Sequence, residues 1–416
     1  MSHHTRRDVL RGGLAAAALG VVHASCGGSE PRPAPAPAKP PEPKRILILG
    51  GTGFLGPKTI AAAVARGHHV TIFNRGKREK VLPLEIAVEH LYGNRDPNLP
   101  ADEEHPEGSP KGLEQLAGKT WDVAIDNSGY FPRMVDASAR LLADHVSRYI
   151  YISSISAYDD NPAQGGDEDA KLATLADPTV ETMGAQFENY GGLKVLCEKA
   201  AAAALPGRTA IVRPGYIVGP GDPTDRFTYW PMRIAQGGSV LAPGSPDDPL
   251  EWIDVRDLAD WLVAMVEHGT TGTFNALGPA APARWGDVLD ACVKAAANDA
   301  KLEWVPASWL DEHGMGGEDA FPIWAPPVGK LAGAHRWKNE RAKAAGLTFR
   351  PVADTVAAIR AWYPGEIERR VRVTHELEAA ARAKGVTPKQ GPDPSALRAG
   401  PTRDREQELL AQWRGH

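Results

Sequence analysis

The sequence has little cysteine, little excess of charge and no long apolar stretch. Its three cysteines, Cys26, Cys197 and Cys292, form no CxxC pair, so neither a zinc or other metal site nor a disulfide framework is expected. A net charge of −5 over 416 residues gives no electrostatic reason to expect nucleic acid as a partner. The apolar run from Leu14 to Val22 is too short to span a bilayer comfortably, which argues against a transmembrane helix.

The N-terminus has the features of an export signal. Arg6 and Arg7 precede the apolar run, and Cys26 follows it after small residues. Residues 1–26 therefore resemble a twin-arginine signal, with an ordinary Sec signal as the alternative. Cys26 either carries a lipid anchor or lies beside a simple cleavage site. Residues 27–43, rich in Pro and Ala, should form a stiff linker, and we expect an exported, periplasmic or envelope-associated protein.

Short strands alternate with helical segments between residues 44 and 220. The first strand, at 45–49, is apolar without alternation, as expected when both faces of a sheet are covered. The order predicts an α/β fold, a doubly wound parallel sheet of the Rossmann type, as a dinucleotide-binding domain over residues 44–220. Further strands are expected at 69–73, 87–91, 121–125, 149–152 and 209–212, and helices at 61–66, 134–143 and 194–204.

After residue 220 the composition changes, because Pro, Gly and Trp become frequent. We expect a smaller substrate-binding region over residues 221–364, in which a strand and a helix at 251–267 return to the body. Residues 365–416 are charged and rich in Ala. They should form a helical tail that packs on the body or on a second subunit of a homodimer.

A glycine-rich loop separates the first strand from the helix that follows. Glycine permits a tight turn and lets backbone amides approach phosphate, and the helix N-terminus adds partial positive charge. The loop is expected to hold the pyrophosphate of NAD or NADP, and a glycine cluster without a ligand is the alternative. Its residues are Gly50, Gly51, Thr52, Gly53, Phe54, Leu55 and Gly56.

The second strand is followed by a basic turn that bears on the choice of cofactor. An acidic residue there would accept hydrogen bonds from the ribose 2′-hydroxyl of NAD, but the strand ends in Asn74 and Arg75. Arg75 can instead pair with a 2′-phosphate, which favours NADP over NAD, and a solvated basic turn is the alternative. Asp96, after the next strand, either accepts a hydrogen bond from the adenine amine or is a turn residue.

Tyr190 and Lys194 are four residues apart, which places them on one face of a helix. A free phenol has a pKa near ~10 and is a poor base at neutral pH. A neighbouring ammonium favours the phenolate, which could take the proton of a substrate hydroxyl while hydride leaves the carbon. An ordinary surface pair is the alternative.

The chain resembles an extended short-chain dehydrogenase/reductase of the NAD-dependent epimerase/dehydratase kind over about residues 44–267. The resemblance implies that Ser154, rather than Ser153, holds the substrate oxygen. It implies that Tyr190 is the acid/base and that Lys194 also contacts the nicotinamide ribose. The matching segments are the glycine loop, Tyr149-Ile150-Tyr151-Ile152-Ser153-Ser154, the stretch from Tyr190 to Lys194, Arg213-Pro214-Gly215-Tyr216-Ile217-Val218-Gly219-Pro220, and Trp252-Ile253-Asp254-Val255-Arg256-Asp257.

Two segments depart from the family's pattern. The fourth strand runs into Ser128 and Tyr130 without the usual small residues, and we expect these two on the cofactor and substrate sides respectively. The stretch 155–189 is long and acidic, and is a lid, a substrate loop or a solvated insertion. Other candidate substrate contacts are Arg226, Tyr229 and Trp252, with core packing of the aromatic rings as the alternative.

The export signal and the redox site together predict redox-neutral chemistry. No NADP pool reduces a spent cofactor outside the cytoplasm, so an exported enzyme should keep its dinucleotide bound and restore it in each cycle. Epimerisation, isomerisation, dehydration or oxidation-assisted cleavage of a free sugar, glycoside or polyol satisfies this condition. The alternatives are an NADPH-dependent carbonyl reductase with exchangeable cofactor and a non-catalytic dinucleotide-binding protein on the same scaffold.

Overall fold

The computed structural model describes residues 42–79, 82–97, 112–162, 164–316, 320–388 and 391–416. These residues belong to one compact unit, Pro41–His416. The predicted signal over residues 1–26, with Cys26, and nearly all of the predicted linker lie outside the described residues. Within the described ranges no helix is both long enough and apolar enough to cross a membrane.

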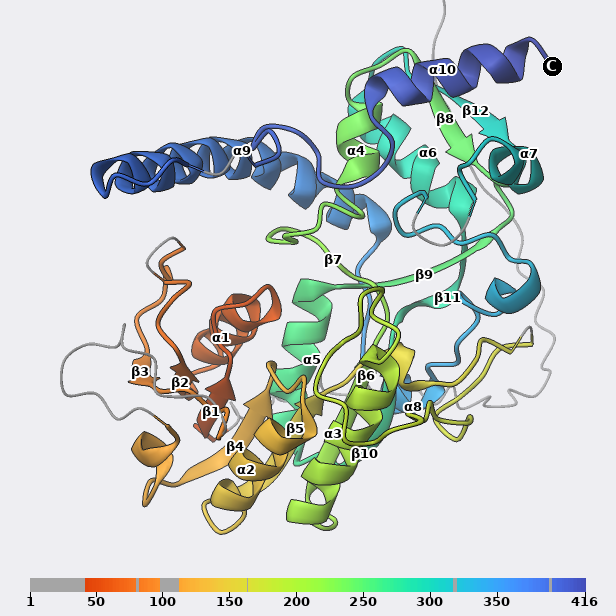
Figure 1. Cartoon of the computed structure of the whole chain (residues 1–416). Helices are drawn as coiled ribbons and strands as arrows, with labels where there is room; N and C mark the ends of the chain where they lie inside the picture. Colours follow the sequence, from red (N-terminus) through yellow and green to blue (C-terminus); the bar gives the residue numbers. More distant parts are fainter. Residues whose placement is uncertain (1–41, 80–81, 98–111, 163, 317–319, 389–390) are drawn as a thin grey trace, which may run out of the picture. The chain divides into compact units, whose positions relative to one another are not determined.

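A seven-stranded sheet forms the centre of the first half of the structure (Figure 1). Its strands are ordered β10-β6-β5-β4-β1-β2-β3, and every neighbouring pair is parallel. The predicted doubly wound α/β fold is therefore confirmed. The strands are β1 (Arg45–Leu49), β2 (His69–Asn74), β3 (Glu89–Tyr92), β4 (Trp121–Asp126), β5 (Val146–Ile152), β6 (Thr209–Pro214) and β10 (Gly272–Ala276).

Helices cover both faces of this sheet, as the unbroken apolar run of β1 predicted. Alternate residues of a strand point to opposite faces. Ile46 and Ile48 accordingly pack in one apolar cluster with α1 (Leu55–Ala65) and α5 (Val255–His268). Leu47 and Leu49 pack in the other cluster with α2 (Pro132–Leu142) and α3 (Tyr190–Ala204).

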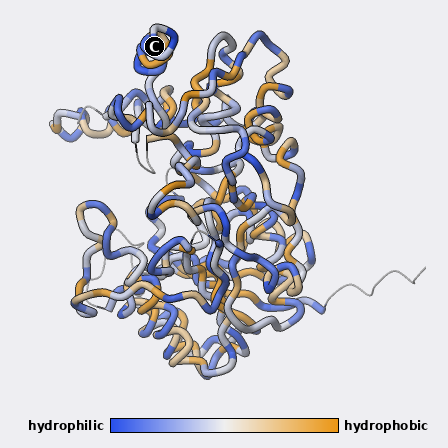
Figure 2. Tube along the Cα trace, turned by 90° about the vertical axis from the view of Figure 1, so that its right-hand side faces the viewer, coloured by the Kyte–Doolittle hydropathy of each residue, from blue (hydrophilic) through white to orange (hydrophobic). Residues whose placement is uncertain are grey.

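The second half is built from smaller elements around buried tryptophans. Trp230, Trp285 and Trp324 are fully buried, and each indole N–H donates a hydrogen bond, to Pro322 O, Pro243 O and Asp248 Oδ2 respectively. Apolar and polar stretches alternate along the chain, as Figure 2 shows, and each half has buried apolar clusters of its own. The elements are β7 (Ile217–Val218), α4 (Tyr229–Ile234), β8 (Ser239–Pro243), β9 (Pro249–Asp254), β11 (Gly278–Arg284), α6 (Trp285–Ala296), β12 (Lys301–Val305) and α7 (Ala307–Glu312), whereas α8 (Glu340–Ala344) packs on β10 of the seven-stranded sheet.

The C-terminal residues form two helices that pack on the body of the same chain. The first, α9 (Val352–Ala383), contacts α4 and α6, and the second, α10 (Arg403–Arg414), contacts β8 (Figure 1). The boundary expected between residues 364 and 365 lies within α9, which continues through Pro364. Buried Glu406 of α10 accepts a hydrogen bond from Arg233 Nε at 2.5 Å and another from Leu241 N at 3.0 Å.

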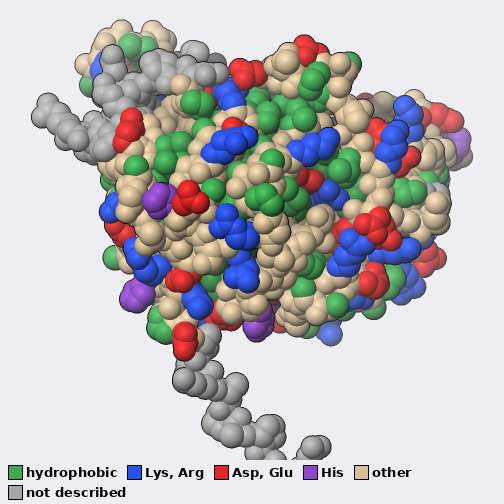
Figure 3. Space-filling model, turned by 90° about the horizontal axis from the view of Figure 1, so that it is seen from below, with side chains coloured by type: hydrophobic (Ala, Val, Ile, Leu, Met, Phe, Trp, Pro, Cys, Tyr) green, Lys and Arg blue, Asp and Glu red, His purple; other side chains and the backbone are tan. Residues whose placement is uncertain are grey.

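Basic and acidic side chains are interspersed on the lower face of the molecule (Figure 3). This mixture agrees with the small net charge of −5. A large surface of one sign would attract a polyanion or a polycation over a long range. This face offers no such field.

Candidate functional site

Two adjoining cavities lie where the parallel strands end, the place at which doubly wound sheets bind their ligands. The larger cavity, of about 1030 Å³, has Ser154, Tyr190 and Lys194 in its wall. The smaller, of about 390 Å³, is lined by the turn that follows β2 and by the segment after β3. The two cavities share the wall residues Gly50, Gly53, Asn127 and Tyr130. Together they form one elongated site with the glycine loop at its middle.

The glycine loop is shaped for a ligand that approaches the bare backbone. Gly50 has φ +83°, and a Cβ there would lie 2.6 Å from Ser128 Cβ. A Cβ on Gly56 would lie 2.2 Å from Gly51 O, so helix and loop can pack this closely only without a side chain. A Cβ on Gly53, by contrast, would meet nothing within 4 Å, and this residue faces both cavities.

The rest of the loop divides between the two cavities. Phe54 and Leu55 line the larger cavity, whereas Thr52 lines the smaller one. Gly51 lines neither, because it packs against Ile72 of β2. Phe54 is the N-cap of α1 and makes no side-chain cap hydrogen bond, so the helix N-terminus can donate its amides to a phosphate.

The smaller cavity holds the residues predicted to select the cofactor. Asn74 Nδ2 donates to Thr52 Oγ1 at 3.2 Å, which ties the end of β2 to the glycine loop. Arg75 is exposed in the cavity wall. Asp96 is buried and accepts hydrogen bonds from Arg133 Nε at 3.0 Å and Nη2 at 2.7 Å, which hold its carboxylate in place. Ser128 also lines this cavity.

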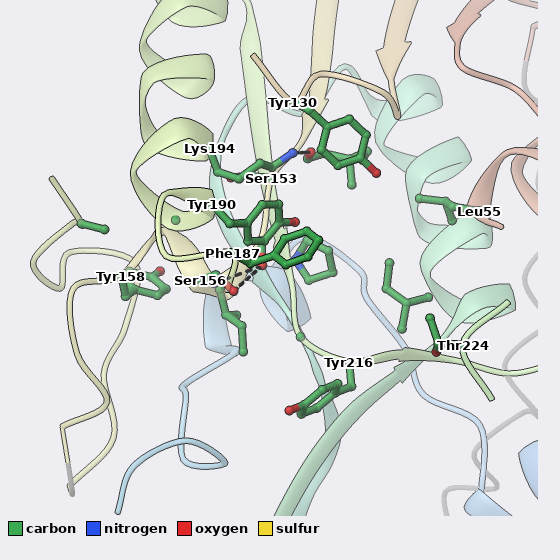
Figure 4. A pocket seen from close by; sticks show the side chains of 18 of the residues that line it. Leu55, Tyr130, Ser153, Ser156, Tyr158, Phe187, Tyr190, Lys194, Tyr216 and Thr224 are labelled. Carbon is green, nitrogen blue, oxygen red and sulfur yellow. Dashed lines mark hydrogen bonds between the residues drawn. The ribbon is translucent and has the colours of Figure 1, made fainter. Parts of the chain in front are cut away.

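Tyr190 and Lys194 lie one turn apart at the start of α3 and reach the same space (Figure 4). Burial raises the pKa of Tyr190 to about 12, and a hydrogen bond with Ser154 and the charge of Arg226 act in the opposite direction. Burial lowers the pKa of Lys194 to about 8. Its Nζ donates to Ile152 O at 2.7 Å and Gly129 O at 3.1 Å.

The two serines after β5 have different surroundings. Ser153 is buried and its Oγ donates to Glu198 Oε1 of α3 at 2.5 Å, so its hydroxyl joins the strand to the helix. Ser154 lies in the cavity wall beside Tyr190 and hydrogen-bonds to Ser156, with 3.1 Å between the Oγ atoms. These contacts favour Ser154 over Ser153 as the residue that faces a substrate oxygen.

The four residues predicted to contact substrate are divided by the structure. Tyr130 and Arg226 lie in the wall of the larger cavity. Tyr229 and Trp252 are buried in the tryptophan-rich core and line neither cavity. Their prediction as substrate contacts is therefore corrected: α4 and β9 present these rings to the interior, where they exclude water.

Several residues of the larger cavity were not predicted as site residues, and three of them have side chains that could bind a ligand. Asn127 follows β4 and lines both cavities, and neither polar atom of its amide has a hydrogen-bond partner in the described residues. Its place directly after a sheet strand was a signal available in the sequence. Phe187 and Asp222 also line the larger cavity. Together with the open face of Gly53, the unpaired amide of Asn127 fits a site for a dinucleotide.

Comparison with known proteins agrees with this geometry. The model of the NAD dependent epimerase/dehydratase family matches residues 46–276, which is more than half of the chain. The epimerase family protein SDR39U1 of Bos taurus is 27% identical over 252 residues, which cover 57% of this chain and 75% of that protein.

Solved structures share the fold at low sequence identity. The Bordetella bronchiseptica enzyme WbmG, in complex with NAD and UDP, superposes with a TM-score of 0.54 at 16% identity, over 78% of this chain and 94% of that one. Human epimerase family protein SDR39U1 (isoform 2), with NADPH, gives a TM-score of 0.51 at 19% identity, over 76% and 98%.

Proposed function

Because this chain belongs to the NAD dependent epimerase/dehydratase family, we propose that it is an NAD(P)-dependent oxidoreductase or epimerase acting at a hydroxyl-bearing carbon of a sugar or polyol. The observation that carries the proposal is the presence of Ser154, Tyr190 and Lys194 in one cavity with the glycine loop. The dinucleotide, when bound, supplies the hydride acceptor and donor. Asn127, Gly53 and the N-terminus of α1 are the groups that would hold it.

Tyr190 is the proposed acid and base. With a pKa of about 12 its phenol is protonated at neutral pH, which suits donation of a proton to a carbonyl oxygen. In the reverse direction the phenolate accepts the proton of a hydroxyl, and positive charge lowers the cost of forming it. Lys194, with a pKa of about 8, keeps most of its positive charge at pH 7 and supplies part of this stabilisation.

We propose NADP rather than NAD as the preferred cofactor. The end of β2 offers Asn74 and the exposed guanidinium of Arg75 in the cavity wall. Both acidic residues in that wall already have partners: Glu79 is engaged by His90 at 3.2 Å and by Asn74, and Asp96 by Arg133. A 2′-phosphate would gain a charge-assisted hydrogen bond from Arg75.

The proposed reaction is redox-neutral, with the dinucleotide retained and restored in each cycle. The support is the predicted export signal at residues 1–26, because an exported enzyme has no cytoplasmic pool with which to exchange cofactor. Export, a lipid on Cys26 and a homodimer belong to the same proposal. A carbonyl reductase would instead exchange NADPH freely and consume it continuously.

One experiment tests the cofactor and the base together. Purified full-length protein is denatured, and released NAD(P) is identified and quantified by chromatography. We expect near-stoichiometric dinucleotide from the wild type. Reduction of the bound dinucleotide by a panel of sugars and polyols should fall by about 10²- to 10⁴-fold in Tyr190→Phe, the usual contribution of a positioned acid–base group.

Tyr229→Phe is the matched control, because Tyr229 lies in the core outside both cavities. It should leave the reduction unchanged. Protein that carries no dinucleotide and binds it weakly contradicts the retained-cofactor proposal. Equal rates for Tyr190→Phe and wild type contradict the role of Tyr190 and favour a non-catalytic binding protein.

A further inference from the structure

Phe187 is an aromatic side chain that the structure leaves exposed at the catalytic cavity. It is 68% exposed and has φ +60°, a backbone conformation that bulky residues rarely adopt. Tyr190 N donates to Phe187 O at 3.0 Å, which fixes the Phe187 backbone to the start of α3. The ring lies beside Tyr190 and Ser156 in Figure 4. Packing in the core explains neither the strain nor the exposure of this ring, and such strain gathers at ligand sites.

Asp222 is a buried carboxylate in the wall of the same cavity. It is only 1% exposed. Oδ1 accepts hydrogen bonds from Thr224 N at 2.9 Å and Thr224 Oγ1 at 2.6 Å, whereas Oδ2 has no partner in the described residues. A buried acceptor without a donor is costly, so a donor from a ligand would stabilise this site.

The segment that carries Asp222 is held rigidly. Three residues further on, the fully buried carboxylate of Asp225 pairs with Arg370 of α9 through two hydrogen bonds of 2.6 and 2.7 Å. Arg398 N donates to the same carboxylate at 3.1 Å. Asp222 is therefore presented to the cavity by a preformed loop, so little conformational entropy is lost when a ligand binds.

Away from the glycine loop, the charges in the cavity wall do not suit a second polyanion beside the dinucleotide. Lys194 Nζ is engaged by two backbone carbonyls, and Arg226 Nε donates to Thr224 Oγ1 at 3.1 Å. Four carboxylates accompany these two cations among the described residues of the wall, and only one of the four, Asp159, has a lysine partner, Lys171, so a second diphosphate would gain little attraction there. The acidic wall residues are Asp159, Asp160, Glu188 and Asp222.

We infer that the larger cavity binds a neutral polyhydroxylated ring, a saccharide or cyclitol without a nucleoside diphosphate. Phe187 packs against the C–H face of the ring, and Asp222 Oδ2 accepts a hydrogen bond from one of its hydroxyls. The inference rests on the proposed function, which it deepens by naming the substrate class and two binding residues.

The test uses full-length protein with its dinucleotide bound. Isothermal titration measures the binding of D-glucose, D-galactose, myo-inositol and UDP-glucose to the wild type, Asp222→Asn and Phe187→Ala. Asp290→Asn is the control, because Asp290 is exposed on α6 and outside both cavities. Thermal unfolding of each variant checks that it is folded. Phe187→Ala should remain folded, because the substitution removes a ring that is exposed to solvent.

We expect at least one neutral polyol to bind more tightly than UDP-glucose by tenfold or more. Asp222→Asn should weaken that binding by about 10- to 100-fold, the usual value of a hydrogen bond to a charged group. Phe187→Ala should weaken it and Asp290→Asn should not. Tighter binding of UDP-glucose, no binding of any polyol, or polyol binding unaffected in both site variants overturns the inference. Protein that still carries dinucleotide and still requires Tyr190 would leave the proposed function intact in each of those cases.

Discussion

The half built on the seven-stranded sheet and the half built around the buried tryptophans differ in the sequence distance over which their contacts act. In the first, parallel ladders join strands whose apolar residues are buried by α1, α2 and α3 from adjacent chain segments and by the later helix α5. In the second, short elements depend on buried ion pairs between distant residues: Arg233 and Glu406 are 173 positions apart, and Asp225 and Arg370 are 145 apart. The buried ion pairs of the first half, Arg95 with Asp126 and Glu198 with Arg213, join residues that are much nearer in the chain, whereas the second half needs the C-terminal helices to be complete.

The largest expected effect comes from breaking a long-range pair. Arg370→Met leaves the buried carboxylate of Asp225 without its main partner, and loss of one partner of a buried pair typically costs about 3–5 kcal/mol of the free energy of unfolding. Denaturant unfolding measures this change. Asp225→Asn in addition to Arg370→Met should recover part of it, because no buried charge is then left unpaired.

Arg140→Ala is the control for that prediction. Arg140 pairs with Asp136 on an exposed face of α2, in the half built on the seven-stranded sheet. No measurable change is expected there. If the two arginine variants lose equal stability, the contrast between the halves is wrong.

The next largest expected effect is a pH dependence of stability that arises from the buried ammonium of Lys194, in the half built on the seven-stranded sheet. Burial lowers the pKa of Lys194 from 10.5 to about 8, so between these values the unfolded chain binds more protons than the folded one. Stability should then rise as the pH increases from about 8 to about 10.5, by at most about 3 kcal/mol from this group. The measurement is the free energy of unfolding across that range for wild type and Lys194→Met.

The rise should be smaller in Lys194→Met, and the difference between the two curves isolates the lysine from other titrating groups. Parallel curves would mean that the ammonium is not desolvated in the folded protein. Lys194 would then be an ordinary surface cation, despite its contacts with two backbone carbonyls.

The smallest expected loss of stability comes from alanine substitutions at two glycines with positive φ. Comparing them separates backbone strain from a steric clash in the glycine loop. Gly50 and Gly67 have φ of +83° and +82°, but only at Gly50 would a Cβ collide, with Ser128. Gly67→Ala should therefore cost about 1–2 kcal/mol of stability from strain alone. Gly50→Ala should cost more than this and should also weaken dinucleotide binding, which fluorescence titration with NADPH measures. Equal effects in both variants would exclude a close contact between Gly50 and Ser128.

The site residues that could be predicted from the sequence are those marked by a pattern of a few neighbouring residues. The glycine loop, Tyr190 and Lys194 were found because turn geometry and helical spacing depend on a few neighbouring residues. Asp222 and Phe187 lack such a signal. Whether the carboxylate of Asp222 lacks a hydrogen-bond donor, or the ring of Phe187 stays exposed to solvent, depends on residues far away in the chain.

The sequence alone determined the parallel α/β architecture, the family and the position of the nucleotide loop, because buried strands and tight turns leave short-range patterns in composition and spacing. Only the tertiary structure decided that Tyr229 and Trp252 belong to the core and that Asp222 and Phe187 belong to the cavity. Part of this arrangement depends on residues far away in the chain, as Arg370 of α9 pairs with Asp225 in the loop that carries Asp222.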